Sequence, residues 1–326
     1  MPDSRLPPCP AAARRAAVPS VVFEDAALLV LNKPSLVPGS AAETAEGLRH
    51  LLESVNKGAR EAAAERLAAG GGGARDTRSL TVVHRPDPAA SGLIVFAKTK
   101  HALDFLSGQF QSKSVEQLYH AVVVVRRAQS ERSAARAGGG AGAGATSSRI
   151  EAAHWPRDPG GGVPAEFAID WWIGREATDP ERMRAFRRNG GQPALSEFRL
   201  LERFGRFAFL ECRLRSNRRH QLRVHLAAAG LPILNDPVYG LPEEQLLLSD
   251  FKRDYKGGGR SGRDGQGKRG REPGERPMIE QVALHASSLT LRHPDTGEPL
   301  TLTAPLPKAF EIAQRNLRKF ARSSRG

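Results

Sequence analysis

Residues 84–93 read His-Arg-Pro-Asp-Pro-Ala-Ala-Ser-Gly-Leu and place one carboxylate, Asp87, beside an arginine in a turn stiffened by two prolines. Short apolar runs at 80–83 and 93–96 flank this turn, and their β-branched residues predict two strands. Pro86 has a fixed φ, and Pro88 biases Asp87 toward extended geometry, so the direction of the carboxylate is nearly set by the chain itself. The stretch predicts a catalytic loop between strands; the alternative is an ordinary surface turn.

A second segment strengthens the catalytic interpretation. Residues 216–226 read Ser-Asn-Arg-Arg-His-Gln-Leu-Arg-Val-His-Leu, and residues 230–240 read Gly-Leu-Pro-Ile-Leu-Asn-Asp-Pro-Val-Tyr-Gly. With the loop at 84–93, they resemble the RluA-type pseudouridine synthases, which carry His-Arg-Leu-Asp-x-x-Thr-Ser-Gly-Leu and, downstream, His-Gln-Ile-Arg-Val-His-Leu and Gly-Asp-x-x-Tyr-Gly. Matching stretches within 24–34, 109–121 and 284–307 extend the resemblance over about residues 20–315.

The coarse pattern of the chain is strands with interspersed helices. Strands are expected at 21–23, 28–31, 118–125, 196–204, 207–214, 282–291 and 300–302, and helices at 101–112 and 218–229. This pattern predicts an α+β fold with a mixed, mainly antiparallel sheet and flanking helices, and the resemblance implies the same pseudouridine synthase catalytic fold.

The expected organisation is one catalytic domain over residues 20–315. A loose tail is expected at 1–19, a basic tail at 316–326, and low-complexity insertions near 128–148 and 256–277, where too little apolar surface is available for a core. We expect no separate N-terminal RNA-binding domain of the kind that some relatives carry.

The net charge of +14 predicts an acidic partner. On charge alone RNA, DNA and an anionic membrane remain open, because phosphate contacts give affinity without identity. No run approaches the roughly 18 apolar residues of a membrane helix, and the start lacks the apolar region of a signal peptide, so we expect a cytoplasmic protein without a membrane partner. Two cysteines and nine scattered histidines show no ligand spacing, so no metal, cofactor or disulfide is expected, and a monomer is the default.

The resemblance implies a reaction that breaks the N1–C1′ bond of uridine, rotates the base and rejoins it through C5. Asp87 matches the catalytic aspartate of the family, which either attacks C1′ or removes the C2′ proton. A desolvated carboxylate needs a nearby cation to stay ionised, and Arg223 matches that partner. Tyr119 matches the tyrosine that stacks on the uracil and acts as base or relay at C5; the alternative is an ordinary strand tyrosine.

Reaching a stacked uridine requires base flipping. Arg85 matches the arginine that fills the gap; the alternatives are a phosphate clamp or a surface charge. His84 and His220 are candidates for the RNA-binding surface or for fixing their loops through hydrogen bonds. Arg218 and Arg219 are candidates for phosphate binding and compete with Arg223 for the basic role.

The chain departs from the family pattern where Pro86 replaces leucine, Ala90 replaces threonine, Gln117 replaces lysine, and Ser-Asn at 216–217 replaces Thr-Gly. The prolines lack an N–H and Ala90 lacks a hydroxyl, so some hydrogen bonds that usually hold the loop are absent. The predicted function is isomerisation of specific uridines in structured ribosomal or transfer RNA. The alternatives are a catalytically weakened RNA-binding protein with the same fold and a hydrolase that uses Asp87 with a histidine such as His84 as base.

Overall fold

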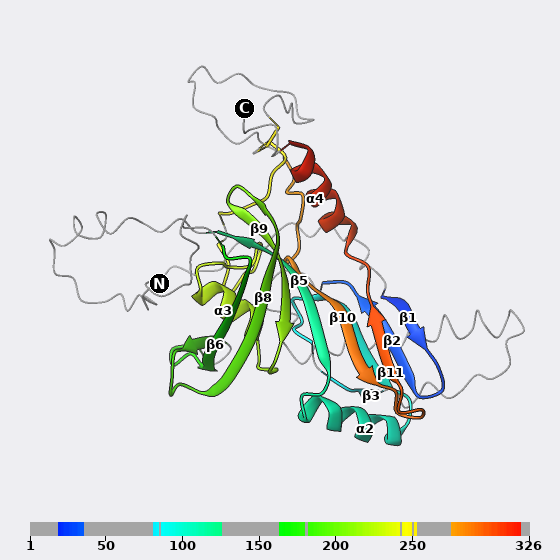
Figure 1. Cartoon of the computed structure of the whole chain (residues 1–326). Coiled ribbons are helices and arrows are strands. Elements are labelled where there is room, and N and C mark those ends of the chain that lie inside the picture. The colour runs from blue at the N-terminus through cyan, green and yellow to red at the C-terminus, as the bar shows by residue number, and fades with distance from the viewer. Residues whose placement is uncertain are drawn as a thin grey trace, which may run out of the picture.

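The computed structural model describes residues 19–35, 81–84, 86–125, 163–179, 182–241, 243–249, 251–252 and 275–320. The predictions for the N-terminal tail, for Arg85, for the insertion near 128–148 and for most of that near 256–277 lie outside these residues. Figure 1 shows the arrangement of the described elements. They are β1 (Ser20–Glu24), β2 (Leu28–Lys33), β3 (Thr81–Val82), β4 (Ser91–Ala97), α2 (Lys100–Gln111), β5 (Glu116–Val124), β6 (Glu166–Arg175), β7 (Met183–Phe186), β8 (Gln192–Phe204), β9 (Phe207–Leu214), α3 (Gln221–Ala228), β10 (Leu284–Arg292), β11 (Pro299–Thr303) and α4 (Lys308–Phe320).

The described strands form one eleven-stranded sheet in the order β1-β2-β4-β10-β5-β9-β8-β6-β7, with β11 on β10 and β3 on β4. Among the described strand pairs, β4 and β10 run parallel and the others run antiparallel. The predicted mixed, mainly antiparallel sheet with flanking helices is therefore confirmed. Because β4 and β10 lie far apart in the sequence, their pairing joins the N-terminal strands to the rest of the sheet.

Two hydrophobic clusters stabilise the sheet. Helix α2 covers β4 and β10 with Ala102 and Leu106, both fully buried. Helix α3 packs against β6, β7 and β8, and helix α4 inserts Phe310, whose ring meets Phe209 of β9 edge-on at 6.5 Å between centroids. The parallel junction between β4 and β10 lies inside the sheet, with β2 on one side of it and β5 on the other (Figure 1).

Gly92 lies at this junction and permits the close approach of β4 to β10. Its φ is +106°, and a Cβ atom built on it would lie 2.2 Å from the carbonyl oxygen of Ala286. A side chain there would force the two strands apart immediately after the predicted catalytic loop.

We therefore expect Gly92→Ala to lower the free energy of unfolding by about 1–3 kcal/mol, the usual cost of overpacking combined with an unfavourable φ. Gly108, in the middle of α2 with open space around it, is the matched control. Gly108→Ala is expected to raise stability by about 0.5–1 kcal/mol because alanine favours the helix. Urea unfolding measures the free energy of unfolding of both variants. Equal values for Gly92→Ala and Gly108→Ala would contradict the close approach of β4 to β10 at Gly92.

Most expected elements are confirmed within a few residues. The hairpin at 196–214 is β8 and β9, and the helix expected at 101–112 is α2, which begins one residue earlier with Thr99 as its N-cap. The helix expected at 218–229 begins only at Gln221, because His220 adopts the left-handed conformation with φ 56° and ψ 22°. A residue in that conformation cannot continue an α-helix toward the N-terminus.

Three elements were not predicted: β6, β7 and α4. Helix α4 continues to Phe320 and therefore crosses the boundary placed between the catalytic domain and the basic tail at residue 315. Its buried Phe310, Ala313 and Leu317 follow helical spacing, so the signal was present in the sequence. Within the described residues, no helix combines the length and the apolar composition that a membrane crossing demands.

Candidate active site

Asp87 follows β3 and begins the loop that leads into β4. Its Oδ1 accepts a hydrogen bond from the backbone N–H of Ala89 at 2.9 Å, and its backbone carbonyl accepts one from the N–H of Ala90 at 3.0 Å. The carboxylate therefore folds back on its own turn, a typical use of aspartate in tight loops. Because both prolines restrict the same turn, the carboxylate points in one fixed direction.

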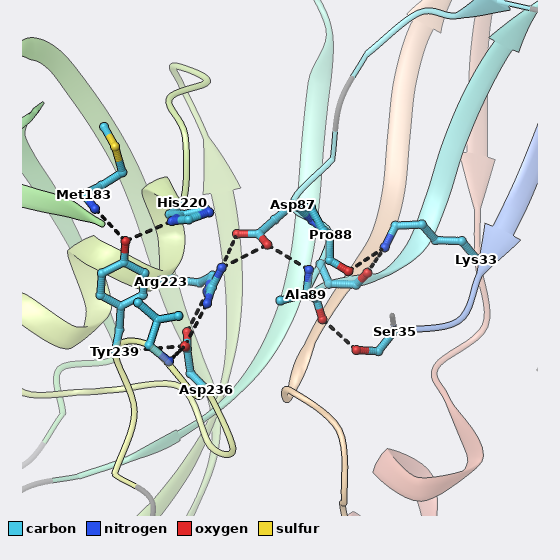
Figure 2. Close-up of polar contacts among 12 residues, drawn as sticks. Lys33, Ser35, Asp87, Pro88, Ala89, Met183, His220, Arg223, Asp236 and Tyr239 are labelled. Carbon is cyan, nitrogen blue, oxygen red and sulfur yellow. Dashed lines mark hydrogen bonds and ion pairs between the residues drawn. The ribbon is translucent and has the colours of Figure 1, made fainter. Parts of the chain in front are cut away.

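Two side chains bind the carbonyl groups of this loop: Lys33, the last residue of β2, and Ser35, two residues further along. The Nζ atom of Lys33 donates to the carbonyl oxygen of Ala90 and, at 3.4 Å, to that of Pro88. The Oγ atom of Ser35 donates to the carbonyl oxygen of Ala89 at 2.7 Å. Three successive carbonyl groups are thus held from β2 (Figure 2), so the loop is fixed although its prolines offer no N–H.

Arg223, from α3, joins Asp87 to a second carboxylate. Its Nη1 atom lies 3.2 and 3.3 Å from the two carboxylate oxygens of Asp87. Its Nε and Nη2 atoms donate to Asp236 at 2.7 and 2.9 Å in a two-point ion pair. Asp236 also accepts the backbone N–H groups of Val238 and Tyr239 at 2.9 and 3.0 Å. The arginine is therefore fixed by Asp236 and presented to Asp87.

The charges of this cluster compensate one another. Burial alone raises the pKa of Asp236, but the hydrogen bonds and the positive charge of Arg223 bring it below its ordinary value. Burial disfavours the charge of Arg223, yet its bonds to Asp236 and the charge of Asp87 leave its pKa raised. Burial lowers the pKa of Lys33 to about 8, against the opposing effect of Asp87. Two carboxylates and two cations thus share the site, which allows an ionised carboxylate in a largely dry environment.

The side chains of the cluster differ in their access to solvent. The side chains of Arg223 and Asp236 are exposed by only 1% and 0%, whereas that of Asp87 is exposed by 12%. Of the two carboxylates bound to Arg223, Asp87 is therefore the one that a substrate can reach.

Helix α3 is anchored at its first residue, Gln221. The side-chain amide donates to the carbonyl oxygen of Leu195 at 3.0 Å and to Oγ of Ser196 at 2.9 Å. Its carbonyl oxygen accepts the hydroxyl of Ser216 at 2.9 Å and the N–H of Arg218 at 3.0 Å. Ser216, one of the departures from the family pattern, thus supplies a hydroxyl to this anchor. These bonds fix the start of the helix that carries the arginine of the site.

Tyr119 lies on β5, which runs between β10 and β9 in the sheet. Its side chain is buried, and burial followed by the negative charge of Asp87 raises the pKa of the phenol well above its ordinary value. The phenol of Tyr119 is therefore protonated at neutral pH.

His84 is buried behind the loop. Its Nε2 atom accepts the backbone N–H of Val95 at 3.2 Å, and its ring stacks on Phe110 at 4.8 Å between centroids. Burial, assisted by the charge of Lys33, lowers its pKa to about 4, so the ring is neutral at pH 7. The structure thus favours the loop-fixing role of His84, and this geometry argues against a hydrolase that uses His84 as its base.

The remaining sequence candidates lie around the start of α3. His220 is buried, with Nδ1 2.9 Å from the hydroxyl oxygen of Tyr239. Arg218 is half-buried and donates from Nε to the carbonyl oxygen of Pro193 at 3.2 Å, while Arg219 is exposed. Among the described residues, Arg223 is the arginine of this segment that pairs with Asp87. Arg85 lies outside the described residues.

Sequence reasoning missed a group of arginines on the hairpin formed by β6 and β7. Each guanidinium carbon lies over an aromatic ring: Arg182 over Tyr239 at 5.6 Å, Arg184 over Phe186 at 5.5 Å, and Arg187 over Trp171 at 5.4 Å. The alternating pattern of residues 166–170 would have predicted β6.

Lys33, Asp236 and Tyr239 were also missed as members of the site. All three stand in motifs that the resemblance had already matched, so a signal for them was available. No group of three or more His, Cys, Asp or Glu in the described part of the chain is arranged to hold a metal ion.

Comparison with known proteins identifies the family. The model of the RNA pseudouridylate synthase family matches residues 27–228, which is more than half of the chain, so the chain belongs to this family. The resemblance to RluA-type pseudouridine synthases is thereby confirmed.

Individual relatives agree with this assignment. The chain is 28% identical over 290 residues to ribosomal large subunit pseudouridine synthase D of Neisseria meningitidis serogroup A, covering 88% of this chain and 58% of that protein. It is 30% identical over 299 residues to the uncharacterized RNA pseudouridine synthase YlyB of Bacillus subtilis, covering 92% of this chain and 73% of the relative. The chain thus spans little more than half the length of the Neisseria protein.

Two human structures share the fold. Human RNA pseudouridylate synthase domain containing 4 superposes with a TM-score of 0.54 and 20% identity, over 91% of this chain and 92% of the other. Human RNA pseudouridylate synthase domain containing 1 gives a TM-score of 0.52 and 18% identity, over 92% and 94%. At these identities the likeness supports the sheet architecture described above.

Proposed function

We propose that this chain isomerises uridine to pseudouridine in structured RNA, with Asp87 as the catalytic carboxylate. The observation that carries the proposal is the asymmetry of the cluster: Arg223 and Asp236 are sealed from solvent, whereas Asp87 shares the same guanidinium and remains reachable. An ionised carboxylate held next to a substrate is what the reaction needs at its first step.

The isomerisation breaks the N1–C1′ bond, forms a C5–C1′ bond, removes the proton on C5 and leaves a proton on N1. Asp87 starts this sequence either by attacking C1′ or by removing the C2′ proton, and both routes use its charged form. Arg223 stabilises that charge, and Lys33 and Ser35 prevent the loop from moving away. Tyr119 supplies a ring for the detached uracil and a hydroxyl that can relay the C5 proton.

The proposed substrate is RNA that binds across the hairpin formed by β6 and β7. Its arginines are backed by aromatic rings, an arrangement that suits phosphates and unstacked bases. The name of the Neisseria relative makes large-subunit ribosomal RNA the first candidate and transfer RNA the second. The monomeric state and the cytoplasmic location stay predictions.

Tritium release from RNA labelled at C5 of uridine tests the proposal. Ribosomal and transfer RNA transcribed in vitro are used separately, because transcripts carry no prior modification. A mock purification from the same host gives the background of contaminating enzymes. We expect release above this background from at least one RNA. Tight RNA binding without release from either RNA would instead support the catalytically weakened RNA-binding protein.

A further inference from the structure

Tyr239 contacts both the catalytic cluster and the arginine-bearing hairpin. The guanidinium carbon of Arg223 lies 5.1 Å from the centre of the Tyr239 ring, and that of Arg182 lies 5.6 Å from it. The ring is therefore within cation–π distance of one buried arginine that binds Asp87 and one exposed arginine that precedes β7.

The hydroxyl of Tyr239 makes two further connections (Figure 2). It accepts the backbone N–H of Met183, the first residue of β7, at 2.8 Å. It also lies 2.9 Å from Nδ1 of His220, which caps α3, and its own proton is available for that nitrogen. The side chain of Tyr239 thus connects β7 and the start of α3 to Arg223.

The contacts of Arg223 explain why it needs this support. Its two bonds to Asp236 measure 2.7 and 2.9 Å, whereas its contacts with Asp87 measure 3.2 and 3.3 Å. The bonds to Asp236 fix one edge of the planar guanidinium group, and rotation about that edge would move Nη1 away from Asp87. The ring of Tyr239, whose centre lies 5.1 Å from the guanidinium carbon, occupies space beside the group and opposes this rotation.

We propose that Tyr239 is a positioning residue that holds the guanidinium of Arg223 in the orientation that meets Asp87 and couples this orientation to the β7 strand. The inference rests on the proposed function, because the coupling matters for a reaction only if RNA lies on the hairpin. Tyr239 itself needs no contact with the reacting atoms.

The test compares Tyr239→Phe, which removes only the hydroxyl, with Tyr239→Leu, which also removes the ring. Thr290→Val on β10 is the matched control, because it removes one exposed hydroxyl that pairs with Thr301 at 3.1 Å. Single-turnover tritium release at saturating RNA gives the rate, and filter binding gives the RNA dissociation constant. Thermal unfolding gives the folded fraction, to which each rate is normalised.

We expect Tyr239→Phe to lower the single-turnover rate about 10-fold and Tyr239→Leu about 100-fold, because small displacements of a catalytic group cost about this much. The RNA dissociation constant should change less than the rate, and Thr290→Val should match wild type. A merely structural role would reduce the folded fraction and leave the normalised rate unchanged, and that result would overturn the inference.

A second readout is independent of RNA. The Nε–H of Arg223, buried against Asp236, is expected to give a slowly exchanging nuclear magnetic resonance signal, assigned by its loss in Arg223→Lys. The signal should persist in Tyr239→Phe and exchange at least about 10-fold faster in Tyr239→Leu, where the ring no longer restrains the group. Unchanged exchange in Tyr239→Leu would refute the positioning role. A further outcome is that wild type releases no tritium while the Nε–H of Arg223 exchanges faster in Tyr239→Leu than in wild type. That result would contradict the proposed function but support the restraint of Arg223 by Tyr239.

Discussion

Asp87→Asn is expected to lower the rate of tritium release from C5-labelled RNA by about 10⁴-fold or more, to the background of the assay. An amide carries no negative charge with which to attack C1′, and it is too weak a base to remove the C2′ proton, so the loss is expected by either route. Stability should change little, because Arg223 keeps its two-point pair with Asp236.

RNA affinity separates this chemical loss from a loss of binding. Asn is nearly the same size as Asp and removes one negative charge from a basic surface, so the dissociation constant should stay level or fall. Asp104→Asn, on the exposed side of α2, makes the same chemical change away from the site and should leave the rate unaltered. Residual activity of Asp87→Asn above a few percent would mean that another group performs the chemistry.

The sequence predicted the local elements of the fold better than their connections. The loop at 84–93 and the helix near 218–229 each carry a local signal, because turn prolines and apolar spacing restrict the backbone over a few residues. The start of α3 was misplaced by three residues because His220 adopts the left-handed conformation. The side chain of His220 contacts the hydroxyl of Tyr239, 19 positions away, and the local pattern of the sequence does not encode such a contact.

The residues of the site show the same difference between what local sequence predicts and what depends on tertiary contacts. Asp87, Tyr119 and Arg223 were predicted through the family resemblance, whereas Lys33, Asp236 and Tyr239 were not. Asp87 and Arg223 lie 136 positions apart, and no periodicity in the chain encodes a contact over that distance. Their meeting depends on strand pairing, including the parallel junction between β4 and β10, and on the anchor of α3 on β8.

Arg223→Met is expected to lower the free energy of unfolding by about 3–5 kcal/mol at pH 7, because it leaves two carboxylates without their shared cation. The fully buried Asp236 should carry most of this cost. Arg223→Lys keeps the charge, but one ammonium group cannot donate to both carboxylates in the geometry of the planar guanidinium. It should therefore lose less stability than Arg223→Met and still lower the single-turnover rate about 100-fold.

The pH dependence of the stability of Arg223→Met follows from the pKa of Asp236. In wild type its pKa lies below the ordinary value of 3.8, so the folded state gains stability that is present above that value and lost as the pH falls through the lowered pKa. Without the arginine, burial alone raises this pKa, and the folded variant takes up a proton that the unfolded chain does not. The difference in stability between wild type and variant should therefore narrow as the pH falls from 7 to 5, which urea unfolding at both pH values measures.

A double variant separates the stability of the cluster from its chemistry. Adding Asp236→Asn to Arg223→Met removes the buried charge that the single variant leaves uncompensated, so much of the lost stability should return. The rate should not return, because Asp87 still lacks the guanidinium that contacts both of its carboxylate oxygens. Recovery of both stability and rate would show that Arg223 serves folding alone and that Asp87 needs no guanidinium. Recovery of stability without rate would assign the arginine to the charge and orientation of Asp87.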